Sequence, residues 1–156
     1  MAKLWDKGFE INAEIERYTV GRDRELDLYL AQDDVLGSMA HITMLESIGL
    51  LEKDELAALL AQLKEIHAQI LQGDFQIEDG IEDVHSQVEL MLTRSLGEMG
   101  KKIHSGRSRN DQVLVDLRLF TRRQMRLVVE DVCSLFKELQ SQSERYKNVL
   151  MPGYTH

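Results

Sequence analysis

Apolar residues recur every three or four positions along most of this chain, a spacing typical of amphipathic helices rather than of strands. The pattern predicts helices over residues 34–48, 53–72 and 82–96, with Gly49 and Gly73 placed to end the first two. The residues expected to point inward are the apolar ones at these spacings: Val35, Met39, Ile42 and Leu45, then Leu56, Leu59, Leu60, Leu63, Ile66 and Ile70, then Val84, Val88, Met91 and Leu92.

The longest uninterrupted pattern covers residues 110–150, which contain neither glycine nor proline. It predicts one helix of roughly 40 residues, about 60 Å long at about 1.5 Å per residue. Helices of this length usually belong to bundles or oligomers, because the apolar face needs partners of comparable length. We therefore expect an all-α fragment of a larger protein, with a helical domain over residues 1–109 and the truncated start of a central helical bundle over 110–156. The apolar stripe of the long helix comprises Val113, Leu117, Phe120, Leu127, Val128, Val132, Leu135 and Leu139.

Composition narrows the range of functions. The formal net charge of -8 argues against a general nucleic-acid binder, although a basic loop could still bind a small anion. The N-terminus lacks the apolar run of a signal peptide, and no stretch approaches the roughly 20 apolar residues of a membrane span. We expect a soluble cytoplasmic protein without a membrane or nucleic-acid partner. The single cysteine, Cys133, excludes an intrachain disulfide and is expected to be a buried thiol.

Residues 97–109 are rich in Gly, Ser, Lys and Arg and are predicted to form a basic loop that leads into the long helix. Helix N-termini offer unpaired N–H groups and the positive end of a dipole, and arginines bind carboxylates and phosphates through two hydrogen bonds. The loop is therefore a candidate anion site. The alternative is a solvated turn in which Ser108 or Asn110 caps the helix.

Three further segments could carry chemistry, each with a simpler interpretation beside it. Residues 83–86 (Asp-Val-His-Ser) read as an ordinary helix cap with a hydrogen-bonded structural histidine. Thr155 and His156 follow a Pro-Gly turn, where a histidine could transfer protons near neutral pH or belong to an unstructured end. Acidic residues cluster at 78–83 but lack a recognisable ligand loop, so no metal site is predicted.

In order and spacing, these segments resemble elements of the argininosuccinate lyase family within the fumarase/aspartase superfamily. The matching elements are Glu-Asp-Val-His at 82–85, Gly-Lys-Lys-Ile-His-Ser-Gly-Arg-Ser-Arg-Asn-Asp-Gln at 100–112 and Met-Pro-Gly-Tyr-Thr-His at 151–156. Parts of residues 3–9 and 26–41 are also similar, so the resemblance covers the whole chain. The element at 100–112 is highly specific, because adenylosuccinate lyases and fumarases differ there.

The resemblance implies the N-terminal part of a fumarase/aspartase-type fold, usually a homotetramer whose active sites are each assembled from three subunits. The implied reaction is the reversible cleavage of argininosuccinate to arginine and fumarate, without a cofactor or metal, in arginine biosynthesis or a urea cycle. The implied site comprises the catalytic His156, the substrate-binding Ser108, Arg109, Asn110, Thr155 and His85, and the supporting Asp83 and Asp27.

Two features depart from the family pattern. The family's Gly-Ser-Ser-x-Met-Pro loop, which carries a catalytic serine and a substrate-binding lysine, does not occur in residues 1–156. We therefore expect the fragment alone to be inactive. Asp23 stands where many members carry a substrate-contacting serine, and that role is not transferred to it.

Three other functions compete with the enzyme hypothesis. They are a non-catalytic, crystallin-type relative on the same fold, a generic helical oligomerisation module, and another superfamily lyase such as one acting on adenylosuccinate. The presence of Asn110, Thr155 and His156 favours the enzyme over the first. The specific element at 100–112 argues against the other two.

Overall fold

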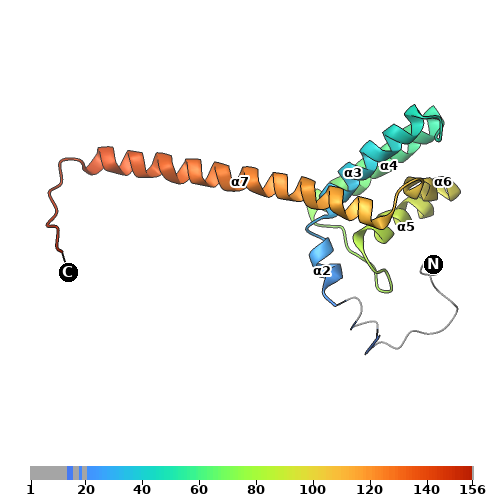
Figure 1. Cartoon of the computed structure of the whole chain (residues 1–156), viewed down its shortest axis with the longest axis horizontal. Helices are drawn as coiled ribbons and strands as arrows, with labels where there is room; N and C mark the ends of the chain where they lie inside the picture. Colours follow the sequence, from blue (N-terminus) through green and yellow to red (C-terminus); the bar gives the residue numbers. More distant parts are fainter. Residues whose placement is uncertain (1–13, 16–17, 19–20, 156) are drawn as a thin grey trace. The chain divides into compact units, whose positions relative to one another are not determined.

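The computed structural model describes residues 14, 15, 18 and 21–155, and these form helices joined by loops (Figure 1). The elements in chain order are α2 (Asp23–Asp27), α3 (Ala31–Ser47), α4 (Lys53–Gln72), α5 (Val84–Leu96), α6 (Glu98–Lys101), the 3₁₀ turn η1 (Lys102–His104) and α7 (Arg109–Tyr146). The described residues contain no strand, which confirms the all-α prediction. No described helix combines the length and apolar character that a membrane crossing requires.

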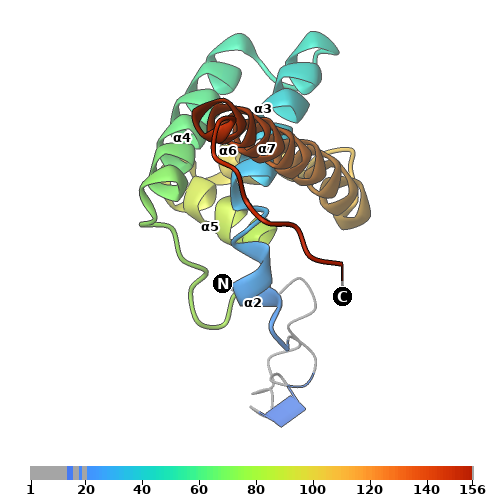
Figure 2. The ribbon, with the colours of Figure 1, turned by 90° about the vertical axis from the view of Figure 1, so that its left-hand side faces the viewer.

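The chain divides into two compact units, Met1–Phe120 and Thr121–His156, and α7 contributes to both. Within the first unit, α3, α4 and α5 pack against one another through the apolar faces that the sequence predicted (Figure 2). The predicted division at residue 110 concerns the complete fold and stays a prediction. The buried core comprises Ala31, Val35, Ile42, Leu45, Leu51, Leu59, Leu63, Ile66, Phe75, Val84, Val88, Leu92 and Ile103.

Helix ends follow local signals in the sequence. The bounds of α4 match the prediction, because a capping box between Glu52 and Glu55 starts the helix and Gly73 ends it with a φ of 81°. In contrast, the prediction of a continuous loop over residues 97–109 was wrong, since α6 and η1 lie within it. A four-residue helix is too short to produce the apolar periodicity on which the prediction rested.

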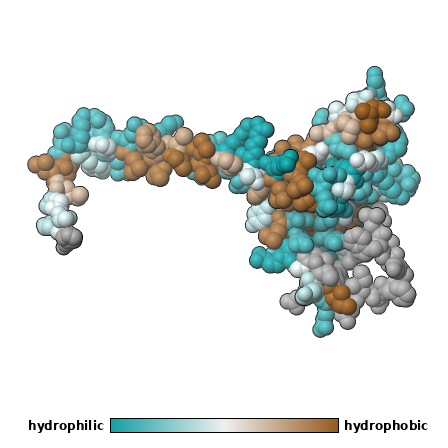
Figure 3. Space-filling model, viewed as in Figure 1, coloured by the Kyte–Doolittle hydropathy of each residue, from teal (hydrophilic) through white to brown (hydrophobic). Residues whose placement is uncertain are grey.

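The long helix α7 buries polar residues rather than its apolar stripe. Its buried residues are Gln112 and Asp116, whereas Leu127, Val128, Val132, Leu135 and Leu139 are between 47% and 60% exposed. Figure 3 shows this apolar surface along the helix. Cys133 is exposed as well, so the expectation of a buried thiol was wrong. The reason is that the second unit contains no described element besides α7 that could cover the helix.

The short helix α6 packs closely on the end of α5. A Cβ atom at Gly100 would lie 2.5 Å from the backbone carbon of Leu92 and 2.5 Å from the backbone nitrogen of Thr93. Backbone atoms of a packed helix cannot move aside as a flexible side chain can, so only glycine allows this approach. The contact folds the segment between α5 and α7 back onto α5.

We predict that Gly100→Ala lowers the free energy of unfolding by roughly 2 kcal/mol, the usual scale for forcing an extra carbon into a packed interior. Thermal unfolding of the full-length protein would measure the effect. Ser95→Ala, on the exposed surface of the neighbouring helix, is the control and should change stability by less than about 0.5 kcal/mol. Equal stability of the two variants would show that α6 does not pack as described.

Candidate functional site

Residues 105–110, which follow η1 and include the first residues of α7, are called the loop from here on. The loop enters α7 through a reciprocal cap between Ser108 and Asp111. The Asp111 carboxylate accepts hydrogen bonds from the backbone N–H of Ser108 at 2.7 Å and from its hydroxyl at 3.0 Å. The Ser108 hydroxyl in turn accepts from the backbone N–H of Asp111 at 3.3 Å. These bonds from Ser108 hold the pKa of Asp111 below its ordinary value. Of the two residues considered as caps from the sequence, Ser108 performs this role, and Asn110 lies exposed in the first turn.

The guanidinium of Arg109 is held at the first turn of α5. Its Nε lies 3.2 Å from a carboxylate oxygen of Asp83, and one terminal nitrogen donates to the hydroxyl of Ser86 at 3.1 Å. The other terminal nitrogen donates to the side-chain oxygen of Gln112 at 3.2 Å. Three partners therefore fix Arg109, whose side chain remains 29% exposed. Its positive charge acts from a set position rather than from a mobile side chain.

Arg107 and His41 tie the same loop to α3. Arg107 donates from a terminal nitrogen to the hydroxyl of Ser38 at 2.9 Å, while its Nε is buried without a hydrogen-bond partner. His41 Nε2 lies 2.8 Å from the backbone oxygen of Ser105 and must carry the proton, because a carbonyl only accepts. Burial lowers the pKa of His41, which favours this neutral, donating form. No local sequence pattern marks the contact of His41 with Ser105.

Three ionisable side chains, from α3, α5 and α7, are buried together beneath the loop. Nδ1 of His85 lies 2.8 Å from Oδ1 of Asp34 and 3.7 Å from Oδ2 of Asp116. These residues are only 4%, 1% and 1% exposed, respectively. One oxygen of each carboxylate, Oδ2 of Asp34 and Oδ2 of Asp116, has no hydrogen-bond partner. The cluster therefore carries negative charge that few hydrogen bonds stabilise.

The protonation of this cluster is shifted by burial and by mutual charge. Burial would lower the pKa of His85, but the hydrogen bond and charge of Asp34 outweigh it, so the pKa of His85 rises. Burial, reinforced by the charge of Asp34, raises the pKa of Asp116 to about 7. Burial lowers the pKa of Arg107, while the charges of Asp34 and Asp116 act in the opposite direction. Above about pH 7, where Asp116 is ionised, two buried acids therefore compensate a buried imidazole and guanidinium.

Two carboxylates order the start of α5, the helix that carries His85. Asp83 accepts a hydrogen bond from the backbone N–H of Ser86 at 2.7 Å, which confirms its interpretation as a helix cap. Asp27 accepts from the backbone N–H of Val84 at 3.2 Å. Burial raises the pKa of Asp27, while this bond and the charge of His85 act against the rise. Both contacts place a carboxylate at the positive end of a helix dipole.

A protein-family model described as a lyase matches residues 11–156. The chain belongs to this lyase family. Similar curated proteins, each named argininosuccinate lyase, include those of Bacteroides fragilis and Bacteroides thetaiotaomicron, which are 73% and 72% identical over 154 residues. The argininosuccinate lyase of Methylococcus capsulatus is 43% identical over 160 residues. These alignments cover 99% of this chain but only 33–34% of each relative, so the chain spans about a third of their length.

Family membership confirms the resemblance drawn from the sequence motifs, and the helical structure of this lyase chain fits the N-terminal region of the fumarase/aspartase fold. Within the first unit, the structure brings Arg109 together with Asp83, and the cap at Ser108 lies one residue before it. His85 is buried and hydrogen-bonded, as the simpler interpretation of the sequence had it. Substrate roles for these residues stay predictions.

The remaining predicted site residues lie elsewhere in this lyase chain. Thr155 is exposed and outside any helix in the second unit, and His156 lies outside the described residues. Asp23, to which no substrate role was transferred, begins the short helix α2. The structure thus describes the loop half of the predicted site and leaves the catalytic role of His156 as a prediction.

One group of side chains in the described part of the chain could hold a metal ion. Asp34, His85 and Asp116 each offer one ligand atom, and these atoms all lie within 4.8 Å of one another. Imidazole and carboxylate are ligands that zinc and manganese accept. However, the positive charge of Arg107 and the hydrogen-bonded proton between His85 and Asp34 already compensate the carboxylates. The cluster therefore has no need of an ion for charge balance.

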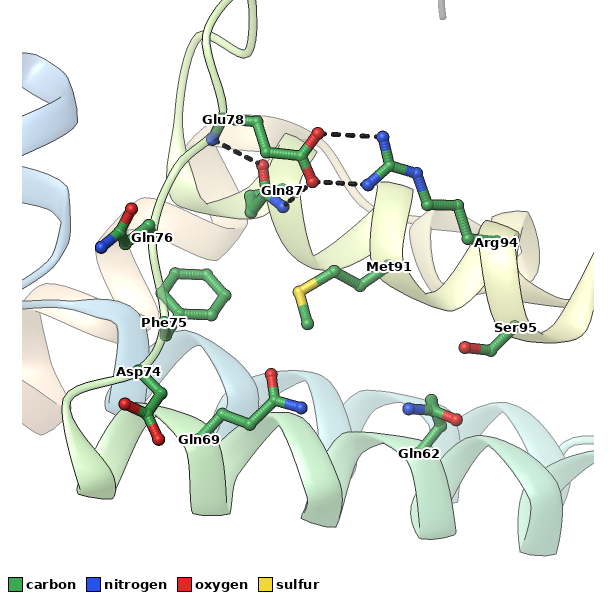
Figure 4. A pocket seen from close by; sticks show the side chains of 10 residues that line it. All are labelled: Gln62, Gln69, Asp74, Phe75, Gln76, Glu78, Gln87, Met91, Arg94 and Ser95. Carbon is green, nitrogen blue, oxygen red and sulfur yellow. Dashed lines mark hydrogen bonds and ion pairs between the residues drawn. The ribbon is translucent and has the colours of Figure 1, made fainter.

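A separate cavity of about 460 Å³ lies beside α4, α5 and the loop that joins them (Figure 4). Its lining is rich in glutamine side chains around Phe75 and Met91. The carboxylate of Glu78 accepts from both terminal nitrogens of Arg94 and from the side-chain amide of Gln87. Glu78 and Arg94 of the lining are paired with each other, and the cavity gives no sign of a particular ligand.

The raised pKa of Asp116 predicts how stability should depend on pH. A carboxyl whose pKa is higher in the folded state contributes stability below its unfolded value of 3.8, and this contribution is lost as the pH rises through about 7. Asp116→Asn removes the penalty of ionisation, so we expect the full-length variant to melt above the parent protein at pH 8. The advantage should be about 2 kcal/mol larger at pH 8 than at pH 5.5.

Asp111→Asn is the control, because the pKa of Asp111 is shifted in the opposite direction from that of Asp116. The pKa of Asp111 is lowered by its hydrogen bonds to Ser108, so its stability contribution is present above pH 3.8 and lost as the pH falls through the folded-state pKa. This variant should melt below the parent protein at pH 8. A pH-independent effect of Asp116→Asn would contradict the assigned shift.

Proposed function

We propose that the full-length protein containing this chain is an argininosuccinate lyase, which cleaves argininosuccinate reversibly to arginine and fumarate. The observation that carries the proposal is the specific element at 100–112, which runs from the end of α6 through η1 into the first turn of α7. It occurs in a chain that is 73% identical to a protein named argininosuccinate lyase. Other lyases of the superfamily differ in this element. No cofactor is required for this reaction.

The chemistry of the loop suits this substrate. Argininosuccinate carries three carboxylates, and the first turn of α7 offers unpaired N–H groups at the positive end of a long helix. Asn110 is exposed there and can donate from its side-chain amide. Arg109 adds a fixed positive charge, because Asp83 and Ser86 hold it in place. We assign Ser108, Arg109 and Asn110 to the binding of substrate carboxylates.

The proposed reaction is an elimination. A base removes a proton from the succinyl carbon beside a carboxylate, and the electron pair passes into that carboxylate to give an aci-carboxylate intermediate. The pair then forms the double bond of fumarate as the carbon–nitrogen bond breaks, and an acid protonates the departing guanidino nitrogen of arginine. Hydrogen-bond donors around the carboxylate stabilise the intermediate. We assign Thr155 to the succinyl group and His156 to proton transfer.

The remaining assignments concern support and assembly. Asp83 and Asp27 order the first turn of α5, which supports their proposed role in holding the loop. We propose a homotetramer with active sites shared between subunits, because the exposed apolar stripe of α7 is suited to a helical bundle. Arginine biosynthesis or a urea cycle would use the reaction in the cytoplasm.

Turnover by the assembled protein tests the proposed function directly. The full-length protein incubated with argininosuccinate should produce fumarate, which is followed by its ultraviolet absorbance. A polypeptide of residues 1–156 should produce none, because it lacks the family's serine loop. Absence of fumarate from a properly assembled oligomer would contradict the enzyme and favour the non-catalytic relative.

A histidine substitution tests the proposed proton-transfer role. His156→Asn in the full-length protein should reduce turnover by at least about a hundredfold, the usual scale for the loss of an acid or base. His67→Asn, a substitution of the same type on α4, is the control and should leave turnover within about twofold of the parent. Near-normal turnover of His156→Asn would exclude that role.

A further inference from the structure

Two buried acids beneath the loop, Asp34 and Asp116, have no place in the proposed chemistry. Neither is accessible to a substrate, since both residues are 1% exposed. Ionised carboxylates are costly in a protein interior unless they are paired. The groups that surround the two carboxylates must therefore account for their burial.

The first connection from this pair runs to α5. Asp34, on α3, receives the hydrogen bond of His85 at 2.8 Å, and Asp116, on α7, faces the same nitrogen at 3.7 Å. The next residue after His85 is Ser86, whose hydroxyl accepts from Arg109. Fixing the ring of His85 thus fixes the turn of α5 that holds Arg109.

The second connection runs through Arg107, which immediately precedes the cap of α7. Its guanidinium lies inward on Ser38, with a buried Nε that has no hydrogen-bond partner. The charges of Asp34 and Asp116 act on it from nearby. These charges compensate a cation that burial alone would drive toward solvent. If one carboxylate were neutral, the inward position of Arg107 would be weakened.

We propose that Asp34 and Asp116 are positioning residues, which set the conformation of the substrate-binding loop through His85 and Arg107. The kinetic part of this inference rests on the proposed lyase function. The loop residues Ser108 to Asn110 follow Arg107 directly, so a shift of Arg107 displaces the groups assigned to the substrate carboxylates. The two acids never touch substrate and act only through the side chains between them.

A metal ion bound by the same residues is the competing explanation, since Asp34, His85 and Asp116 also form a possible set of ligands. The inward guanidinium of Arg107 argues against it, because a divalent cation would be repelled by a cation beside the same carboxylates. The two explanations differ in whether added metal stabilises the protein.

The decisive variant is Asp116→Asn in the full-length protein, compared with the parent at pH 8, where Asp116 is ionised and the substitution removes its charge with almost no change in shape. Glu98→Gln is its matched control, since it removes a carboxylate charge from an exposed ion pair on α6. For Asp116→Asn we expect KM for argininosuccinate to rise about tenfold and kcat to stay within about threefold, as for an interaction that serves binding. The control should leave both constants within about twofold.

The melting temperature distinguishes a role of Asp116 in positioning the loop from a role only in stabilising the fold. Removing the Asp116 charge should not lower the melting temperature at pH 8, so binding should weaken while stability is kept or gained. An unchanged KM, or a raised KM that accompanies a lowered melting temperature, would overturn the proposal. A parent protein that makes no fumarate would instead refute the lyase function. The conformation of the loop would then be measured by a method that does not depend on turnover.

Hydrogen exchange provides that independent measurement. In Asp116→Asn, the backbone amides of residues 104–111 should exchange at least about tenfold faster than in the parent protein, while those of α4 should be unchanged. Unchanged protection of the loop would overturn the proposal whatever the activity. A rise in the parent's melting temperature on addition of Zn²⁺ or Mn²⁺, absent in Asp116→Asn, would also overturn it in favour of a metal site.

Discussion

Buried charge beneath the loop is the constraint on which the arrangement of α3, α5 and the start of α7 depends. Asp34 and Asp116 face His85 and Arg107 in an interior that solvates none of them well. No one of these groups is stable there alone, because an unpaired buried charge costs several kcal/mol. The packing of α3, α5 and α7 brings these groups together, and the resulting contacts hold His85 on Asp34 and Arg107 on Ser38.

Some polar groups of the loop contact other parts of the protein, and others face solvent. Its two arginines are anchored inward, Arg107 on Ser38 and Arg109 on Asp83 and Ser86. What remains toward solvent is the exposed Asn110 and the N-terminal turn of a 38-residue helix. In the proposed binding site, these contacts hold the positive charges in place before a ligand arrives, which reduces the ordering that binding would otherwise require. It suits a substrate with several carboxylates.

Sequence periodicity predicted the helices and the core well but missed the charged cluster. The bounds of α4 follow from its clean apolar face and from Gly73, both of which are local signals. Asp34 and His85 lie 51 residues apart along the chain, Asp116 lies farther on in another helix, and no local pattern joins the three. In the sequence, Asp34 appeared only as the first residue of a predicted helix. Asp116 is one polar residue of a long amphipathic helix, and nothing in the sequence distinguishes it from the exposed polar residues around it. Only the packing of three helices brings these groups together.

The motifs marked the segment that enters α7 as a candidate anion site, but they gave no indication of what its arginines contact within the protein. The structure instead gives each arginine partners on α3 or α5. The long helix shows a related limit of periodicity. Its apolar stripe was recognised, but its buried residues, Gln112 and Asp116, are polar. Their burial follows from the charged groups of neighbouring helices, which periodicity does not detect.

A double-mutant cycle between Asp34 and Arg107 tests whether the two buried charges depend on each other. The unfolding free energy of the full-length protein would be measured for Asp34→Asn, Arg107→Met and the double variant. If the carboxylate compensates the buried guanidinium, Arg107→Met should cost less in the Asp34→Asn background, with a coupling energy of at least about 1 kcal/mol. Effects that add within about 0.5 kcal/mol would show that the two charges do not depend on each other, and would contradict the account.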